Sequence, residues 1–431
     1  MNTHRVLTHS SLVLLLALGA RYATGCSSDE PGAAPDVGDS GSGDETGTVP
    51  DAGGATEDAA DSAVIPDGGP ACNDGGWCRM PVPGIPAPNL KAVHSISPTR
   101  ALAAGETCII QGSQYLCNSS LLLWNGTEWT TVARGLPRIT AIWASDADHF
   151  WIVDESDRSL YRVTFTGDKP TLVVDHLPYD LSTCADVKLA ISGSSEANIY
   201  VAAYCYGSDQ TTRGLLFHRA PADGGSEPVW STVWNAGGDS TFQAALGAVY
   251  VDPSGQAFAA GWKIHASSGT YGARYLIPDV MSTLVLRING NAVQEEELAP
   301  SLAMCPQSIW AGGGTVFVSG VCDGGYNDFT KYPTLVRSAP VDGGPGWLTV
   351  FQTAVGQYGA VGSSFPILWG FAKDDVYAAG SWAQHWDGSS LQTVSLAVNG
   401  APVASRVTSA HGSSPSDVWM VGSGFAMHRT K

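Results

Sequence analysis

The sequence is poor in charged residues and has no apolar run long enough to cross a membrane. Charged residues make up 14% of the 431 positions, which is too few for a typical helical cytosolic enzyme. The apolar run LVLLLALGA at 12–20 has nine residues, whereas a membrane-spanning helix needs about 20. The formal net charge of −18 argues against nucleic-acid binding, which needs a cationic surface.

Motifs of the common enzyme classes are also missing. There is no GxSxG elbow, no HExxH pair and no P-loop, and no GxGxxG follows a predicted strand. No CxxC or Cys/His cluster is present, so we expect neither a metal nor a cofactor. Asp146, Asp252 and Asp374 occupy turn positions, where Asp is favoured by hydrogen bonds to its own backbone. The run Glu295–Glu297 is interpreted as a solvated turn, not as an acid–base pair.

The first 25 residues have the features of an export signal. Arg5 supplies a positive charge before the apolar run, and the sequence ATGC at 23–26 follows the run, with Cys26 last. This resembles the lipobox of bacterial lipoproteins, with Ala23 where Leu is usual. The resemblance implies a signal peptide at 1–25, lipidation of Cys26, and a place at the outer membrane or cell surface through the lipid anchor alone. An ordinary secretory signal is the alternative, and it also implies export.

Residues 26–76 are predicted to be a disordered acidic tether. Positions 27–76 hold 12 Asp and Glu residues and no Lys or Arg, with almost nothing large and apolar before position 72. Such a segment cannot bury enough apolar surface to offset the entropy lost on ordering.

Nine cysteines leave eight once Cys26 is set aside. In an exported protein, neighbouring cysteines indicate disulfides. We therefore predict four structural bridges, Cys72–Cys78, Cys108–Cys117, Cys184–Cys205 and Cys305–Cys322.

One short motif occurs seven times, most clearly as DVYAAG at 375–380 and DVWMVG at 417–422. Alignment places one bulky residue of each copy in a column: Leu102, Trp151, Tyr200, Phe258, Phe317, Tyr377 and Trp419. The spacing of 42 to 60 residues suits four short strands, the content of one propeller blade. A second column lies about eight residues upstream: His94, Trp143, Tyr250, Trp310, Trp369 and His411. The third blade deviates and offers Ile191 or Ser192 at this place. Columns that recur in every copy predict packing between blades and not a local site.

The last copy is incomplete, because the chain ends at FAMHRTK (425–431) after a third strand. The stretch GWCRMPVPGIP (76–86) resembles the fourth-strand stretch WTTVARGLP (129–137), so the start of the chain is predicted to supply the missing strand. Such closure leaves no open sheet edge. The predicted fold is all-β, a seven-bladed β-propeller at 77–431 that is closed by an N-terminal strand and preceded by a disordered acidic linker.

The blade pattern is similar to secreted bacterial propeller repeats of the kelch, Asp-box and tectonin-like kinds. The stretch LLWNGTEW (122–129) has the Gly, Thr and Trp of an Asp-box without its Ser-x-Asp-x-Gly spacing. A single Gly usually follows the second strand, where kelch repeats have two. The resemblance implies a propeller fold and no specific family.

Two features of the third strands carry further expectations. Asn-Gly and Asp-Gly in WNGTEW (124–129), INGNAV (288–293) and WDGSSL (386–391) predict two-residue hairpin turns in which both positions take positive φ.

A basic column on the third strands indicates either an anion-attracting stripe or solvated edge residues with their stems on the sheet. Its members are His218, Arg287, Arg337, His385 and His428.

Long connections between second and third strands carry aromatic and charged residues in blades three to five. Equivalent connections emerge on one face, so we predict an aromatic rim that binds a ligand. Its residues are Tyr206, Arg213, Tyr271, Arg274, Tyr275, Tyr326, Phe329 and Tyr332. The alternative is that these rings fold inward and cap their own loops.

The preferred function is a monomeric, non-enzymatic binding module for a protein or glycan, anchored in the cell envelope. The alternative is a carbohydrate-active hydrolase or lyase of propeller fold, which would gather carboxylates at the channel mouth from distant blades. Two or more convergent carboxylates with an Arg at that mouth would favour the enzyme.

Overall fold

A computed structural model describes residues 70–83, 89–111, 114–167, 169–209, 211–221, 227–238, 242–265, 281–320, 331–341, 344–354, 365–399, 403 and 405–431. All of them belong to one compact unit, Ile65–Lys431. The predicted signal peptide, Cys26 and most of the predicted tether lie outside these residues. Within them the only helices are two 3-10 turns, Leu181–Thr183 (η1) and Pro300–Leu302 (η3).

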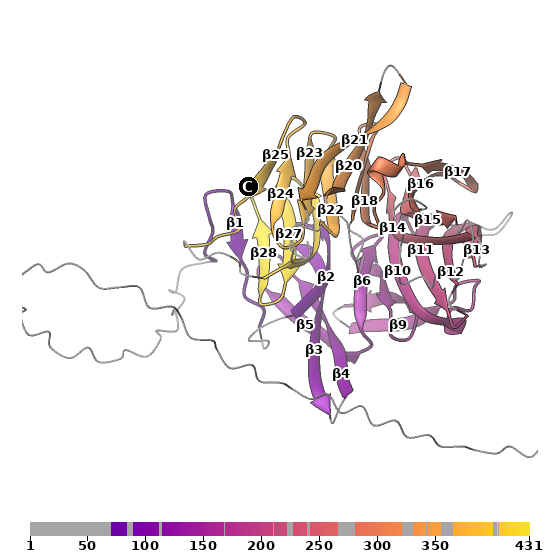
Figure 1. Cartoon of the computed structure of the whole chain (residues 1–431). Helices are drawn as coiled ribbons and strands as arrows, with labels where there is room; N and C mark the ends of the chain where they lie inside the picture. Colours follow the sequence, from indigo (N-terminus) through magenta and orange to yellow (C-terminus); the bar gives the residue numbers. More distant parts are fainter. Residues whose placement is uncertain are drawn as a thin grey trace, which may run out of the picture. The chain divides into compact units, whose positions relative to one another are not determined.

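The strands form seven antiparallel four-stranded sheets, or blades, each running from an innermost to an outermost strand (Figure 1). Blade one has β2 (Asn89–Ser97), β3 (Arg100–Gln111), β4 (Gln114–Trp124) and β5 (Trp129–Leu136), and blade two has β6 (Ile139–Ala144), β7 (His149–Asp154), β8 (Ser159–Thr166) and β9 (Lys169–Asp175). Blade three has β10 (Cys184–Ser195), β11 (Asn198–Gly207), β12 (Thr212–Pro221) and β13 (Pro228–Gly237), and blade four has β14 (Phe242–Val251), β15 (Ala257–His265), β16 (Met281–Asn289) and β17 (Ala292–Glu297). Blade five has β18 (Pro306–Gly312), β19 (Thr315–Gly320), β20 (Lys331–Val341) and β21 (Gly344–Ala354), and blade six has β22 (Ile367–Ala372), β23 (Asp375–Ala379), β24 (Ala383–Trp386) and β25 (Leu391–Val394). Blade seven has β26 (Val407–Ser414), β27 (Asp417–Gly422), β28 (Phe425–Arg429) and β1 (Trp77–Arg79).

The innermost strands close into a ring. Each contacts the innermost strand of the next blade, from β2 through β6, β10, β14, β18, β22 and β26 back to β2. The all-β, seven-bladed propeller is therefore confirmed. Below, the entry end is the end at which the innermost strands begin, and the turn end is the opposite one, where the first and second strands are joined.

Closure of the ring by the N-terminal strand is also confirmed. Strand β1 pairs with β28, with Trp77 opposite Arg429 and Arg79 opposite Met427, and the two strands lie side by side in Figure 1. The preceding residues already contact blade six, because Asn73 Nδ2 donates to the Ser395 carbonyl oxygen at 2.9 Å.

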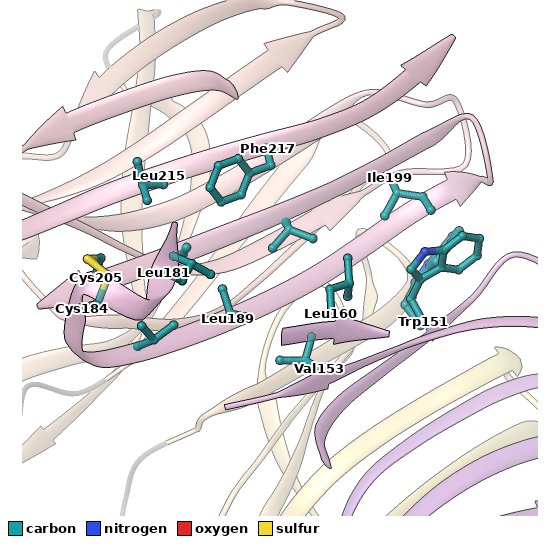
Figure 2. Packing of buried hydrophobic residues seen from close by; sticks show 14 residues of the cluster. Trp151, Val153, Leu160, Leu181, Cys184, Leu189, Ile199, Cys205, Leu215 and Phe217 are labelled. Carbon is teal, nitrogen blue, oxygen red and sulfur yellow. A yellow bond between two sulfur atoms is a disulfide. The ribbon is translucent and has the colours of Figure 1, made fainter. Parts of the chain in front are cut away.

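Packing between blades follows the predicted columns. The register pairs Trp143 with Trp151 and Trp419 with His411, and the other five blades pair the same two columns. Seven hydrophobic clusters result, each joining one blade to the next. In Figure 2, Trp151 of blade two lies near Ile199 of blade three, in the cluster that also holds Phe217. The expectation that the columns serve packing is correct.

Three of the predicted disulfides are present, Cys72–Cys78, Cys108–Cys117 and Cys184–Cys205. Cys305 is also disulfide-bonded, and its predicted partner Cys322 lies outside the described residues. Disulfides persist in oxidising compartments, which agrees with export.

The predicted two-residue turns are wrong for WNGTEW and WDGSSL. In INGNAV a two-residue turn is present, because Asn289 pairs with Ala292, but it consists of Gly290 and Asn291 and not of Asn289 and Gly290. Trp124 pairs with Trp129, so the loop between them has four residues, and Asn125 accepts backbone hydrogen bonds from Thr127 and Glu128. Asp387 does the same in WDGSSL. Only the glycine of each motif has positive φ. The side chain of Asn or Asp shapes the turn by accepting these bonds, so its own backbone stays at negative φ.

A buried carboxylate joins the two blades that meet at the closure. Asp417 is fully buried and accepts hydrogen bonds from Ser95 Oγ of blade one at 2.7 Å, from His428 Nε2 at 2.7 Å and from Ser413 Oγ. Burial by itself would raise the pKa of Asp417, but the bonds from His428, Ser413 and Ser95 lower it. Asp417 is thus held as a carboxylate at neutral pH.

We predict that Trp77→Ala lowers the free energy of unfolding by about 3–5 kcal/mol, because Trp77 is buried in the closing strand and its loss leaves a cavity. Arg79→Ala is the matched control on the same strand. Arg79 is exposed and donates one hydrogen bond to Gly424, so its loss should cost about 1 kcal/mol or less. Chemical denaturation measures both, and equal losses would contradict the role of Trp77.

Stability should also depend on pH through the stacked rings of His94 and His411, whose centroids are 3.8 Å apart. Burial lowers the pKa of His411 to about 4, although contacts with Ser95 and Asp417 raise it. Burial and the neighbouring His411 lower the pKa of His94 well below 6.5. Between pH 6.5 and about 4 the unfolded chain binds more protons than the folded one, so stability falls as the pH falls.

The shift of His411 corresponds to at most about 3 kcal/mol across this window. Denaturation at several pH values measures the slope. The variant His94→Phe keeps a ring in the stack and removes one titrating group, so its slope should be shallower. An unchanged slope would show that other groups set the acid sensitivity.

Candidate functional site

Most of the predicted aromatic rim lies outside the described residues. Tyr271, Arg274, Tyr275, Tyr326 and Phe329 are not among them, and Tyr332 is described only as a backbone position opposite Thr353. The strands that flank these connections are described, and β15, β16, β19 and β20 bring both connections to the entry end.

Tyr206 and Arg213 are described, and the structure does not bring their side chains together. Tyr206 lies opposite Asp186 on one face of blade three, whereas Arg213 lies opposite Cys205 on the other face. The Arg213 guanidinium donates to the Tyr179 hydroxyl at 3.1 Å and lies over its ring, with its Cζ 5.8 Å from the ring centroid. Tyr179 precedes blade three, and no pattern in the sequence singles it out.

A group of charged side chains occupies the entry end of blades one to three. Glu106, whose side chain is 4% exposed, pairs with Lys91 Nζ at 3.1 Å and Arg138 Nε at 2.8 Å. Asn89 Nδ2 donates to the same carboxylate at 3.2 Å. Lys91 is the extra residue of a bulge between Leu90 and Ala92. Bulges re-aim side chains and are common beside functional sites.

Glu155 extends this group on blade two. Burial raises its pKa, while Lys188 and Arg138 lower it and Asp186 raises it further. Next to it, Asp154 is fully buried and its pKa is also raised by burial. A half-buried carboxyl with a raised pKa beside specific charges is a mark of functional sites.

Two exposed residues of β10 complete the group. Asp186 lies opposite Tyr206, and Lys188 lies opposite Tyr204. Burial, together with Asp186 and Tyr206, raises the pKa of Tyr204 to about 12. We call Lys91, Glu106, Arg138, Glu155, Asp186 and Lys188 the entry-end cluster.

The basic column on the third strands is not one exposed stripe, because two of its five members are buried. His218 and His428 are buried, and their rings stack on Tyr200 and Trp419 at 4.0 Å. The register places each basic residue opposite the aromatic column residue of its own blade. Packing on the column rings therefore explains His218, His428, His385 and Arg287, whereas Arg337 lies over Trp386.

The acidic run in blade four is part of a strand, which corrects its interpretation as a solvated turn. Glu295 and Glu297 lie in β17 and pair with Lys263 of β15, in the second case at 3.1 Å. Glu296 accepts a bond from Trp347 Nε1 at 2.7 Å. The expected turn role of Asp is confirmed at Asp252, whose Oδ1 accepts hydrogen bonds from the backbone N–H groups of Ser254 and Gln256.

An open groove of about 610 Å³ lies at the turn end over blades four to six. Its cations include Arg337, whose Cζ lies 5.4 Å from the ring centroid of Trp386. Two of its three acids serve the fold, since Glu296 is bonded to Trp347 and Asp387 to its own turn, whose hydrogen bonds lower the pKa of Asp387. Neither Glu296 nor Asp387 is therefore free to act in an acid–base pair. The third, Asp374, is exposed.

Comparisons with known proteins agree with the fold and give no family. No protein-family profile and no curated protein sequence matches the chain. Among solved structures, YCF48 from Cyanidioschyzon merolae is 14% identical, with 82% of this chain and 98% of that chain covered and a TM-score of 0.46. The β-propeller domain of the trilobed protease from Pyrococcus furiosus is 8% identical, with coverage of 78% and 91% and a TM-score of 0.40. Likeness of this degree concerns the fold alone and carries no functional argument.

A search for membrane-crossing helices in the described part of the chain found none. The described residues form a seven-bladed β-propeller, and no family is assigned to the chain.

Proposed function

We propose that the protein is an exported binding module that recognises a polar ligand, a glycan or a protein surface, at its entry end. The observation that carries the proposal is the entry-end cluster, in which Glu155, Arg138, Asp186 and Lys188 interact across two blades of a closed ring. Binding groups held by a rigid scaffold lose little entropy when the ligand arrives.

Tyrosines beside these charges suit such a ligand. Tyr204 and Tyr206 stand opposite Lys188 and Asp186 on the same face of blade three. A tyrosine offers a flat apolar ring and a polar hydroxyl, which suits sugars and protein surfaces alike. The strands that flank the other predicted connections, β15, β16, β19 and β20, also reach this end of the ring.

One observation favours the alternative of a carbohydrate-active enzyme. Glu155 has a raised pKa near Arg138, as a general acid requires. The nearby Glu106, however, uses both carboxylate oxygens in bonds to Arg138 and to Lys91 and Asn89. Both oxygens of this carboxylate are occupied and its charge is balanced by two cations, and for this reason we favour binding over catalysis.

The test is a glycan array and a pull-down with the unit from Ile65 onward. The double variant Asp186→Ala/Lys188→Ala should weaken binding at least tenfold. Lys373→Ala/Asp374→Ala is the matched control, because this exposed pair of the same charges lies at the turn end, and it should bind normally. Equal effects of the two variants would contradict the proposed surface. Cleavage of a bound glycan that Glu155→Gln abolishes, with binding retained, would establish the enzyme instead.

We also propose that lipidated Cys26 anchors the module in the outer membrane or at the cell surface. The support is the lipobox-like ATGC sequence followed by the polar, acidic segment, together with the disulfides of the propeller. Wild-type protein should partition into the detergent phase, and Cys26→Ser should move it into the aqueous phase. Wild-type protein in the aqueous phase would indicate an ordinary secretory signal.

A further inference from the structure

Three potential metal ligands from two blades meet at the turn end. Asp146 and His149 lie in and beside the turn that joins β6 and β7 of blade two, and Glu196 lies in the turn that joins β10 and β11 of blade three. One ligand atom from each lies within 4.8 Å of the others. This site is distinct from the entry-end cluster, because it is at the opposite end of the blades.

The distances suit a small divalent ion. His149 Nδ1 lies 2.9 Å from Asp146 Oδ2 and 3.3 Å from Glu196 Oε1. Ligand atoms at about 2.0–2.2 Å from a tetrahedral Zn²⁺ are about 3.3–3.6 Å apart. Small rotations of the three side chains, which are 53%, 41% and 39% exposed for Asp146, His149 and Glu196, would bring them around one ion.

The two carboxylates of the site lack a Lys or Arg partner. Within the described residues, His149 is the only basic group that pairs with either Asp146 or Glu196. An imidazole Nδ1 carries at most one proton, so it cannot donate a full hydrogen bond to both carboxylates. The convergence of two unneutralised carboxylates on one imidazole nitrogen is what a bound cation would stabilise.

Both turns are fixed by bonds from neighbouring strands. Asp146 Oδ1 accepts backbone bonds from the next residues of its turn, including His149 N at 3.0 Å, and this leaves Oδ2 for an ion. The guanidinium of Arg100, from blade one, donates to the Ala147 carbonyl at 3.1 and 3.2 Å. Arg219 donates to the Glu196 carbonyl. The backbone of both turns is thus held in place before any ion binds.

We propose that Asp146, His149 and Glu196 form a zinc site that links blades two and three. Three protein ligands leave the fourth position of a tetrahedral ion to water. The imidazole selects Zn²⁺ over Ca²⁺ and Mg²⁺, which prefer oxygen ligands in larger number. The other group of similar composition, Glu106 with Cys108 and Cys117, is no competitor because its sulfurs are bonded to each other.

Calorimetric titration of the full-length protein with Zn²⁺ tests the proposal. Wild type should show one site that binds one equivalent, and His149→Ala should abolish it. Glu196→Gln should weaken it at least tenfold, because the amide is a far poorer ligand than the carboxylate. His176→Ala is the matched control, since His176 is exposed and outside the group. The acidic N-terminal segment is the same in all four proteins, so its own binding of zinc cancels in the comparison.

Two further measurements keep the test independent of folding. Visible absorption of bound Co²⁺ should change when His149 is replaced, because the spectrum reports nitrogen coordination. Zn²⁺ should raise the melting temperature of wild type and not of His149→Ala, because an ion that bridges two blades stabilises the folded state. Identical isotherms for wild type and His149→Ala, or equal affinity for Ca²⁺ and Zn²⁺, would overturn the proposal.

Discussion

The propeller depends on one contact that is repeated seven times, in which a bulky side chain of each second strand packs against the next blade. A single four-stranded sheet has two apolar faces and cannot cover either of them alone. Trp151, Tyr200, Phe317 and Trp419 are each no more than 1% exposed because the neighbouring blade covers them. The stability of every blade is therefore shared with two neighbours, and the ends of the ring can carry polar groups at little cost.

The repeated contact is also why so much of the fold could be predicted. A packing position recurs in every blade. Alignment of the seven column residues, from Leu102 in blade one to Trp419 in blade seven, therefore identifies all the second strands, and the register confirms the alignment. The closing strand was also predictable from the repeat, because the last copy supplies three strands where the other copies supply four. Local turn geometry was less predictable, because Asn125 acts through its side chain and not through its backbone angles.

The candidate sites were not predictable, because they depend on proximity that no sequence spacing encodes. Glu106 and Arg138 are 32 residues apart, and the bulge at Lys91 is visible only in the register. His149 and Glu196 come from turns of different blades. The predicted rim rested on connections that are long in sequence, and of its eight residues the side chains of Tyr206 and Arg213 are described, on opposite faces of one blade.

The order of synthesis gives the closing strand a further consequence. A ribosome makes Trp77–Arg79 first and its partner Phe425–Arg429 last, and Cys78 contacts a residue 352 positions away, Thr430. Contacts of such sequence separation form slowly, because the chain must lose loop entropy before it gains them. Until Phe425–Arg429 is available, the first strand therefore has an unpaired edge, and blade seven is the last blade to be completed. A nascent chain that stops short of the final strand stays an open arc with two sheet edges available to other chains.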